Sequence, residues 1–249
     1  MRVSPSAAVG VFLTIVLVTV VPLVFGGSVA AAPTRTCPTP VAPLETMIPT
    51  ARPNFRLEKQ QWLADQLRQR RFITVALGDS IMEGWPLALL DQATGGPAIN
   101  AGFGQDGTEQ VLWRLRTTDW RDQSPQRVLL LVGTNDLRFD ACAIYQGILT
   151  VVAQVRRVFP SASVVVTAIL PRGNNLLEHD QTIAETNALL NLGAESHAFR
   201  FFNPHDAFLC NHQTPCALFQ PGNLHLTAEG YGLLSRLLAT YLRPNGEAP

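Results

Sequence analysis

Residues 73–80, Ile-Thr-Val-Ala-Leu-Gly-Asp-Ser, decide the fold of this chain. The run from 73 to 77 is apolar, rich in β-branched side chains and ended by Gly78, which predicts a short buried strand. A serine at the strand-to-helix junction that follows exposes its hydroxyl group, and its own N–H faces the space where an oxyanion would develop. Asp79 and Ser80 are also ordinary helix N-cap residues, so the stretch alone does not separate a nucleophile from a cap.

The same alternation of short apolar runs and longer amphipathic segments continues along the chain. Further strands are predicted at 127–132 and 163–170, with weaker candidates at 97–100 and 199–202. Apolar positions three and four apart predict helices at 57–70, 107–116, 141–159, 182–197 and 227–242. This order predicts an α/β fold, a three-layer α/β/α sandwich around a mainly parallel five-stranded sheet, with sites at the carboxyl ends of the strands.

Three further polar clusters lie where such a fold places a site. The loop at 100–108 is rich in glycine, which lets the backbone approach a ligand closely. Gly-Thr-Asn-Asp at 133–136 follows a strand, and the Asn135 amide can donate to an oxyanion. His225 precedes a helix that Thr227 can cap, which makes it the one candidate general base among the five histidines. Each cluster alone is also compatible with an ordinary turn or cap.

Together these clusters resemble a known family. Gly-Asp-Ser at 78–80, the downstream Gly102, Gly-Thr-Asn-Asp at 133–136 and His-Leu-Thr at 225–227 resemble, in this order, the motifs of the SGNH or GDSL hydrolases. The resemblance spans about residues 73–242 and implies the flavodoxin-like fold of that family. Within it, 106–115 and 170–173 look like the catalytic subunits of intracellular platelet-activating factor acetylhydrolase, which are not exported.

The resemblance implies a role for individual residues. Ser80 would be the nucleophile, and His225 the base that takes its proton and returns it to the leaving alcohol. The oxyanion hole would be formed by the N–H groups of Ser80 and Gly102 and by the side-chain amide of Asn135. Asp79 and Asp136 would support the site, and no metal or organic cofactor is required.

One position departs from the family pattern. The family carries an aspartate three residues before the histidine, where this chain has Gly222. The carboxylate normally fixes the imidazole tautomer and stabilises the imidazolium ion. Asn223 and Asp206 are the candidate substitutes, and a backbone carbonyl could also orient the ring. A Ser–His dyad with weakened activity is therefore expected.

These observations favour an exported serine esterase that removes a short acyl group, most simply acetyl, through a Ser80 acyl-enzyme. An O-acetyltransferase that acts on envelope polysaccharide is an alternative, since a sugar hydroxyl can intercept the same intermediate. A catalytically degenerate module that binds a glycan is a second alternative, because of Gly222. The expected partner is a small-molecule or glycan ester, and the oligomeric state is left open.

Composition narrows the class of protein. The 249 residues include 47% hydrophobic and 15% charged residues, with 19 basic and 19 acidic side chains. Disordered chains, collagen-like repeats and nucleic-acid binders have composition biases that are absent here. A zero formal charge also gives no overall electrostatic steering of a substrate.

The N-terminus accounts for part of this hydrophobicity. Residues 7–32 carry no charge, which predicts an export signal at 1–32 or an uncleaved anchor, the only expected contact with a membrane. A proline-rich linker is predicted at 33–54, the hydrolase domain at 55–243 and a short tail at 244–249. We expect a periplasmic or secreted protein.

Four cysteines follow the predicted signal, an even number that favours two disulfides in an oxidising compartment. The simplest pairing joins Cys210 to Cys216 and leaves Cys37 for Cys142, although three pairings are formally possible. A metal site built from Cys210, His212 and Cys216 is the alternative, but its spacing matches no common zinc pattern.

Overall fold

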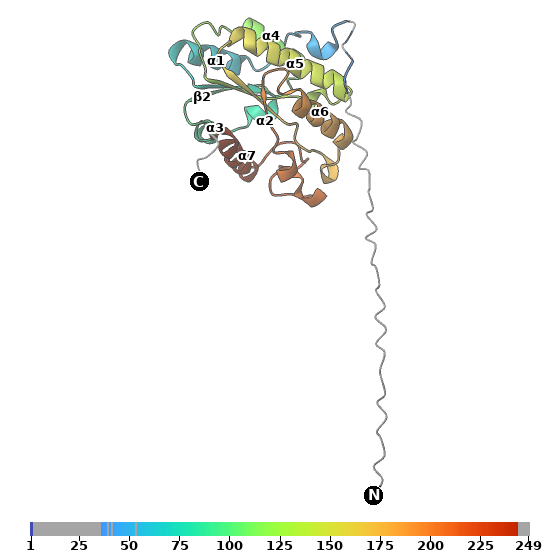
Figure 1. Cartoon of the computed structure of the whole chain (residues 1–249). Coiled ribbons are helices and arrows are strands. Elements are labelled where there is room, and N and C mark those ends of the chain that lie inside the picture. The colour runs from blue at the N-terminus through green and yellow to red at the C-terminus, as the bar shows by residue number, and fades with distance from the viewer. Residues whose placement is uncertain (2–35, 39, 41, 53, 244–249) are drawn as a thin grey trace. The chain divides into compact units, whose positions relative to one another are not determined.

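A computed structural model of the chain describes residues 1, 36–38, 40, 42–52 and 54–243 (Figure 1). The chain divides into two units, residues 1–34 and 35–249, and the account below concerns the second. The predicted signal and the predicted C-terminal tail lie outside the described residues, apart from Met1. Among the residues that the structure describes, no helix is both long and apolar enough to cross a membrane.

The unit is built on a five-stranded, fully parallel sheet, as the sequence predicts. The strands are β1 (Thr74–Gly78), β2 (Ala98–Gly102), β3 (Arg127–Leu131), β4 (Ser163–Thr167) and β5 (Arg200–Phe202). Their order is β2-β1-β3-β4-β5, so the chain passes from one side of β1 to the other between β2 and β3. In open α/β sheets, ligands bind at this reversal of strand order, outside the carboxyl ends of the strands.

Helices cover both faces of the sheet, which confirms the three-layer sandwich (Figure 1). One layer contains α1 (Leu57–Gln69), α4 (Thr108–Thr117), α5 (Ala141–Val158) and α6 (Asp180–Gly193). The other contains α2 (Ser80–Glu83), α3 (Leu87–Thr94) and α7 (Ala228–Leu242). Successive strand residues point to opposite faces. Val75 and Leu77 therefore pack under the first layer and Ala76 under the second.

Some element boundaries differ from the sequence-based prediction. Strand β4 ends at Thr167 and not at residue 170, because the side-chain amide of Asn187 forms hydrogen bonds with the backbone N–H and carbonyl of Ile169 in place of a neighbouring strand. It accepts the Ile169 N–H at 2.9 Å and donates to the Ile169 carbonyl at 2.9 Å. Helix α6 spans Asp180–Gly193 and stops short of residue 197, and the short helix α3 was not predicted.

The segment predicted as a linker, residues 33–54, differs most. Its described residues 42–52, here called the N-terminal strap, include a short 3₁₀ helix, η1 (Glu45–Met47). Thr46 is fully buried, and its hydroxyl donates to the Ala143 carbonyl at 2.7 Å. Its own carbonyl accepts the hydroxyl of Thr108 at 2.8 Å. The strap is thus packed against α4 and α5 and is not an extended spacer.

Both disulfides favoured by the sequence are formed. Cys37 is bonded to Cys142 in the first turn of α5, which ties the region before the strap to the domain. Cys210 is bonded to Cys216 across a short loop that contains the 3₁₀ helix η5 (Cys210–His212). Since the two sulfurs of the alternative metal site are bonded to each other, the proposed set of Cys210, His212 and Cys216 is not assembled.

Candidate active site

Ser80 and His225 meet at the carboxyl end of β1, although they are 145 positions apart in the sequence. The Nε2 atom of His225 lies 2.9 Å from the Oγ atom of Ser80. Ser80 is the first residue of α2, directly after β1, and His225 precedes α7. Both side chains are only partly buried, so the pair is accessible to a small molecule. A nucleophile and a base in hydrogen-bonding contact are the basic requirement for acyl transfer.

The turn before α7 holds the histidine in place. The backbone carbonyl of His225 accepts the Gln220 N–H at 2.8 Å, and the neighbouring Leu226 is fully buried. Thr227 caps α7 by accepting the Gly230 N–H at 3.2 Å, and its hydroxyl donates to the Ala217 carbonyl at 2.6 Å. The backbone on both sides of the imidazole is therefore fixed.

Helix α7 is also joined directly to the region of Ser80. The Tyr231 hydroxyl donates to the Ile81 carbonyl at 2.8 Å, one residue after Ser80. The indole N–H of Trp85 donates to the Ser235 hydroxyl at 2.9 Å. Both bonds are buried, so they fix α7 relative to α2 and set the distance between Ser80 and His225.

Asp79 directly precedes Ser80 and caps the helix that Ser80 begins. Its Oδ1 accepts the Ile81 N–H at 2.9 Å and so caps α2, while Oδ2 has no hydrogen-bond partner among the described residues. The side chain is fully buried. Burial raises the pKa of Asp79 to about 7, so near neutral pH the carboxyl group is partly uncharged.

Gly102 does not take the position that the family resemblance implied. Its N–H donates to Oδ1 of Asn100 at 3.0 Å, so this donor is already used. The Asn100 amide in turn donates to the carbonyls of Met82, at 2.7 Å, and Trp85, at 3.1 Å. This asparagine therefore joins β2 to the end of α2, and the assignment of Gly102 to the oxyanion hole is corrected.

The free N–H of this loop belongs to Gln105. The N–H groups of Phe103, Gly104 and Asp106 bind the carbonyl of Gly78, the carboxylate of Glu83 and the carbonyl of Phe103, respectively. The Gln105 N–H makes no hydrogen bond with any residue of the described ranges. Gln105 directly follows Gly104 in the chain. A β-carbon added to Gly104 would lie 3.8 Å from Cβ of Ser80, so this part of the loop lies beside Ser80.

The backbone of Gln105 is left-handed, with φ of 61°. Two hydrogen bonds from Arg52 in the strap hold it there, one to its carbonyl at 2.9 Å and one to its side-chain oxygen at 3.0 Å. No sequence signal marks this residue, because its free N–H becomes evident only when the partners of its neighbours are known.

Asn135 lies beside the same loop, in the 3₁₀ helix η2 (Thr134–Asp136) that follows β3. Its side-chain amide donates to the Asp106 carbonyl at 2.9 Å. An amide group carries two N–H donors, so the second remains for a substrate oxygen. The side chain is partly exposed. Asn135 therefore holds the loop at 100–108 through one amide N–H, and its second amide N–H remains as a donor near the carboxyl ends of the strands.

Two buried carboxylates stabilise this arrangement. Asp106 is fully buried and forms a two-pronged ion pair with Arg114, whose guanidinium lies 3.6 Å from the centre of the Phe103 ring. Asp136 is also fully buried and accepts the Thr108 N–H at 3.0 Å. Burial and the adjacent Glu109 raise the pKa of Asp136 to about 8.

The two candidate orienters of the imidazole lie elsewhere. The Asp206 carboxylate is 91% exposed and lies 3.3 Å from Nδ1 of His205, while Asn223 offers its carbonyl to the Gly173 N–H at 2.9 Å. No hydrogen bond reaches Nδ1 of His225 from the part of the chain that the structure describes. The structure therefore presents a Ser–His pair without a carboxylate, as the departure at Gly222 suggests.

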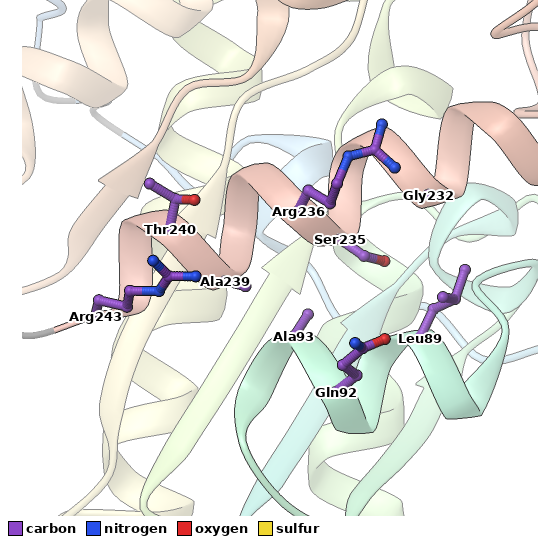
Figure 2. A pocket seen from close by; sticks show the side chains of 9 residues that line it. All are labelled: Leu89, Gln92, Ala93, Gly232, Ser235, Arg236, Ala239, Thr240 and Arg243. Carbon is purple, nitrogen blue, oxygen red and sulfur yellow. The ribbon is translucent and has the colours of Figure 1, made fainter. Parts of the chain in front are cut away.

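Other potential sites are separate from this pair. Within the described ranges, no group of three or more His, Cys, Asp and Glu side chains is arranged to hold a metal ion. A cleft of about 460 Å³ lies between α3 and α7 (Figure 2). It is lined by Leu89, Gln92, Ala93, Gly232, Ser235, Arg236, Ala239, Thr240 and Arg243. Neither Ser80 nor His225 lines it, so this cleft is not where the pair would hold a substrate.

Comparison with known proteins identifies a family for this chain. Residues 76–233 match the sequence profile of the GDSL-like lipase/acylhydrolase family. The platelet-activating factor acetylhydrolase IB subunit alpha1 of Pongo abelii is 34% identical over 149 residues, which are 58% of this chain and 63% of that protein. The same subunit of Homo sapiens is 32% identical over 146 residues, with the same two coverages. The chain thus spans less than two thirds of the length of these curated relatives.

Solved structures share the fold at lower identity. A GDSL-like lipase from Bacteroides thetaiotaomicron is 20% identical with a TM-score of 0.58, covering 74% of this chain and 93% of its own. A mutant of an acetyl-xylooligosaccharide esterase from Geobacillus is 13% identical with a TM-score of 0.57, covering 73% of this chain and 97% of its own. At these identities the likeness is one of fold.

Proposed function

The chain belongs to the GDSL-like lipase/acylhydrolase family, and from this premise we propose that it is an exported serine esterase that removes short acyl groups, above all acetyl. The contact of 2.9 Å between Ser80 Oγ and His225 Nε2 carries the proposal. Relatives named as acetylhydrolases and a structural neighbour named as an acetyl-xylooligosaccharide esterase support acetyl as the acyl group.

The geometry suggests how the residues act. Nε2 of His225 accepts the proton of the Ser80 hydroxyl while Oγ attacks the ester carbonyl, and the carbonyl oxygen becomes negatively charged. The N–H groups of Ser80 and Gln105 and the second amide N–H of Asn135 stabilise this oxyanion. When the tetrahedral intermediate collapses, the C–O bond to the alcohol breaks and His225 returns the proton to the leaving oxygen. Water then hydrolyses the acyl-enzyme by the same steps.

The lack of a carboxylate at the histidine sets the expected strength of the activity. Without a hydrogen bond at Nδ1, the imidazolium formed in each transition state gains no stabilisation from a neighbouring negative charge. We therefore place the protein among slow esterases. Export is supported by the uncharged stretch at 7–32 and by the two disulfides, since disulfides persist in oxidising compartments.

The test is hydrolysis of p-nitrophenyl acetate by the protein purified from an oxidising host compartment. The wild type should release nitrophenol and react with a fluorophosphonate probe, and Ser80→Ala should do neither. Ser80→Ala should melt at nearly the same temperature as the wild type, because within the described residues the only hydrogen bond of Ser80 Oγ is the one to the partly buried His225. Equal hydrolysis by the two proteins would refute the assignment of Ser80. Cell fractionation with an antibody tests export.

A non-catalytic glycan-binding module is the second candidate. One observation favours it: no residue in the described part of the chain makes a hydrogen bond with Nδ1 of His225. Glycan binding that is unaffected by Ser80→Ala, together with no ester hydrolysis, would support it. A glycan acceptor added to the esterase assay also separates hydrolysis from O-acetyl transfer, since transfer moves acetyl to the glycan instead of releasing acetate.

A further inference from the structure

An exposed guanidinium group lies beside the nucleophile. A β-carbon added to Gly104 would lie 3.8 Å from Nη2 of Arg56 and also 3.8 Å from Cβ of Ser80. The two atoms are therefore no more than twice that distance apart, which is within the length of a small ester. The Arg56 side chain is 55% exposed. Its charge is thus both close to the scissile bond and open to a ligand.

Arg56 reaches this position through its place at the start of α1. It is the N-cap residue of that helix and has a left-handed backbone with φ of 56°, a conformation that few non-glycine residues adopt. The neighbouring Phe55 ring lies 5.8 Å from the Arg56 guanidinium carbon and 4.1 Å from that of Arg52.

The local charge is not balanced. Arg56 forms one ion pair, with Glu83 at 3.5 Å. The Glu83 carboxylate is shared, because it also pairs with Lys59 at 3.5 Å and accepts the Gly104 N–H at 2.8 Å. The ion pairs around the loop join four cations, Arg52, Arg56, Lys59 and Arg114, to two carboxylates, Glu83 and Asp106. Asp79 and Asp136 also lie beside the loop, but burial raises their pKa values to about 7 and about 8, which reduces their negative charge near neutral pH. Burial lowers the pKa of Lys59, but an excess of positive charge remains without it.

We propose that Arg56 binds an anionic group, a carboxylate or a phosphate, that the ester substrate carries next to its scissile bond. The planar guanidinium presents paired N–H donors that match the oxygens of either group. Arg52 supplies a second positive charge near the loop. Its side chain is 25% exposed and also donates a hydrogen bond to the Gln105 carbonyl. This inference rests on the proposed esterase function of Ser80 and adds a substrate class to it.

A purely structural role for Arg56 makes a different prediction. If the side chain served only to hold Glu83, and through it Gly104, its loss would loosen the loop beside Ser80. Anionic and neutral esters would then be affected alike. A binding role instead changes the ratio of the two rates, which separates the two explanations.

The experiment measures kcat/KM for two matched pairs of esters, with spontaneous hydrolysis subtracted. The pair 4-acetoxybenzoate and 4-acetoxybenzamide places the charge on the alcohol side. The pair phenyl hydrogen glutarate and phenyl pentanoate places it on the acyl side. Each is tested on wild type, Arg56→Gln and the control Arg68→Gln, which removes a 65% exposed arginine near the other end of α1.

In at least one pair, we expect Arg56→Gln to lower the ratio of anionic to neutral kcat/KM about tenfold, the factor for one charge-assisted hydrogen bond. Arg68→Gln should leave the ratio unchanged, and added salt should lower it in the wild type. An unchanged ratio in both pairs, with neutral esters still cleaved in a Ser80-dependent way, overturns the inference and leaves the esterase intact. Absence of Ser80-dependent cleavage of all four esters refutes the proposed function and this inference with it.

Discussion

Replacement of Gly222 by aspartate should restore a carboxylate three residues before His225, the proposed general base. Gly222 lies in an exposed turn, and a β-carbon added there would meet no atom within 4 Å. Its φ of 93° lies in the left-handed region, which residues other than glycine adopt only under strain. The substitution therefore has room for the new carboxylate but strains the backbone.

Both effects can be given magnitudes. Strain in this region costs about 1–2 kcal/mol, and for a domain of this size each kcal/mol lowers Tm by about 2–4 °C. We expect Gly222→Asp to melt about 2–8 °C below the wild type. In serine proteases, loss of the carboxylate lowers kcat by about 10⁴, which is the upper limit of the possible gain. The turn around Gly222 has not evolved to position a carboxylate against His225, so the gain should stay below that limit. We expect kcat for an acetyl ester to rise about 10- to 100-fold.

The matched control is Gly222→Asn, which has the same shape and backbone strain but no charge. Thermal melting should give similar losses for both variants, and steady-state kinetics should show a gain in kcat for aspartate only. Equal kcat values for Asn and Asp would show that the charge has no part in the gain. If both variants stay folded and react with a fluorophosphonate but neither gains activity, the reasoning that His225 lacks only a carboxylate is wrong.

Three further changes test the surroundings of the pair. Arg52→Ala removes both hydrogen bonds that hold Gln105, so kcat for a neutral acetyl ester should fall about tenfold with little change in KM, and Arg52→Lys should recover part of it. Asn100→Ala removes the donor of the buried Trp85 carbonyl and the acceptor of the Gly102 N–H, and urea unfolding should show a loss of about 2–4 kcal/mol. Asp136 keeps its proton to about pH 8 when folded but loses it near pH 4 when unfolded, so its contribution to stability declines between these values. The free energy of unfolding of Asp136→Asn should therefore decline less than that of the wild type between pH 4 and pH 8, and an identical slope would contradict the raised pKa.

Although β2 and β5 gave weaker patterns, the sheet was predictable mainly because β1, β3 and β4 are short, mostly apolar and almost wholly buried. Such strands appear in the sequence as compact runs ended by glycine or proline, and β1 is the clearest example. The end of β4 was not predictable, because it depends on the side chain of Asn187, eighteen positions away from Ile169. Helix α3, with eight residues, is too short to show a clear period.

At the site, the sequence indicated the two side chains that meet, Ser80 and His225, but not all of their surroundings. Ser80 and His225 stand at strand and helix ends, where a local pattern reveals them. The choice between Gly102 and Gln105 as oxyanion donor depends on which N–H groups are already bonded, and the partners come from Asn100 and Glu83. Proline content likewise suggested a linker where the strap packs, because the burial of Thr46 depends on contacts with distant helices.

The missing carboxylate and the excess of positive charge have a common consequence. In the proposed transition state, N–H donors would match the oxyanion, but the imidazolium of His225 would have no hydrogen-bonded carboxylate in the described part of the chain. The nearby arginines, Arg56 among them, add further positive charge and so oppose formation of that cation. An anionic group on the substrate would offset both charges, so the substrate itself would supply what Gly222 does not. It follows that the preference for anionic esters should weaken in Gly222→Asp, and a preference of unchanged size in that variant would show that the two features act independently.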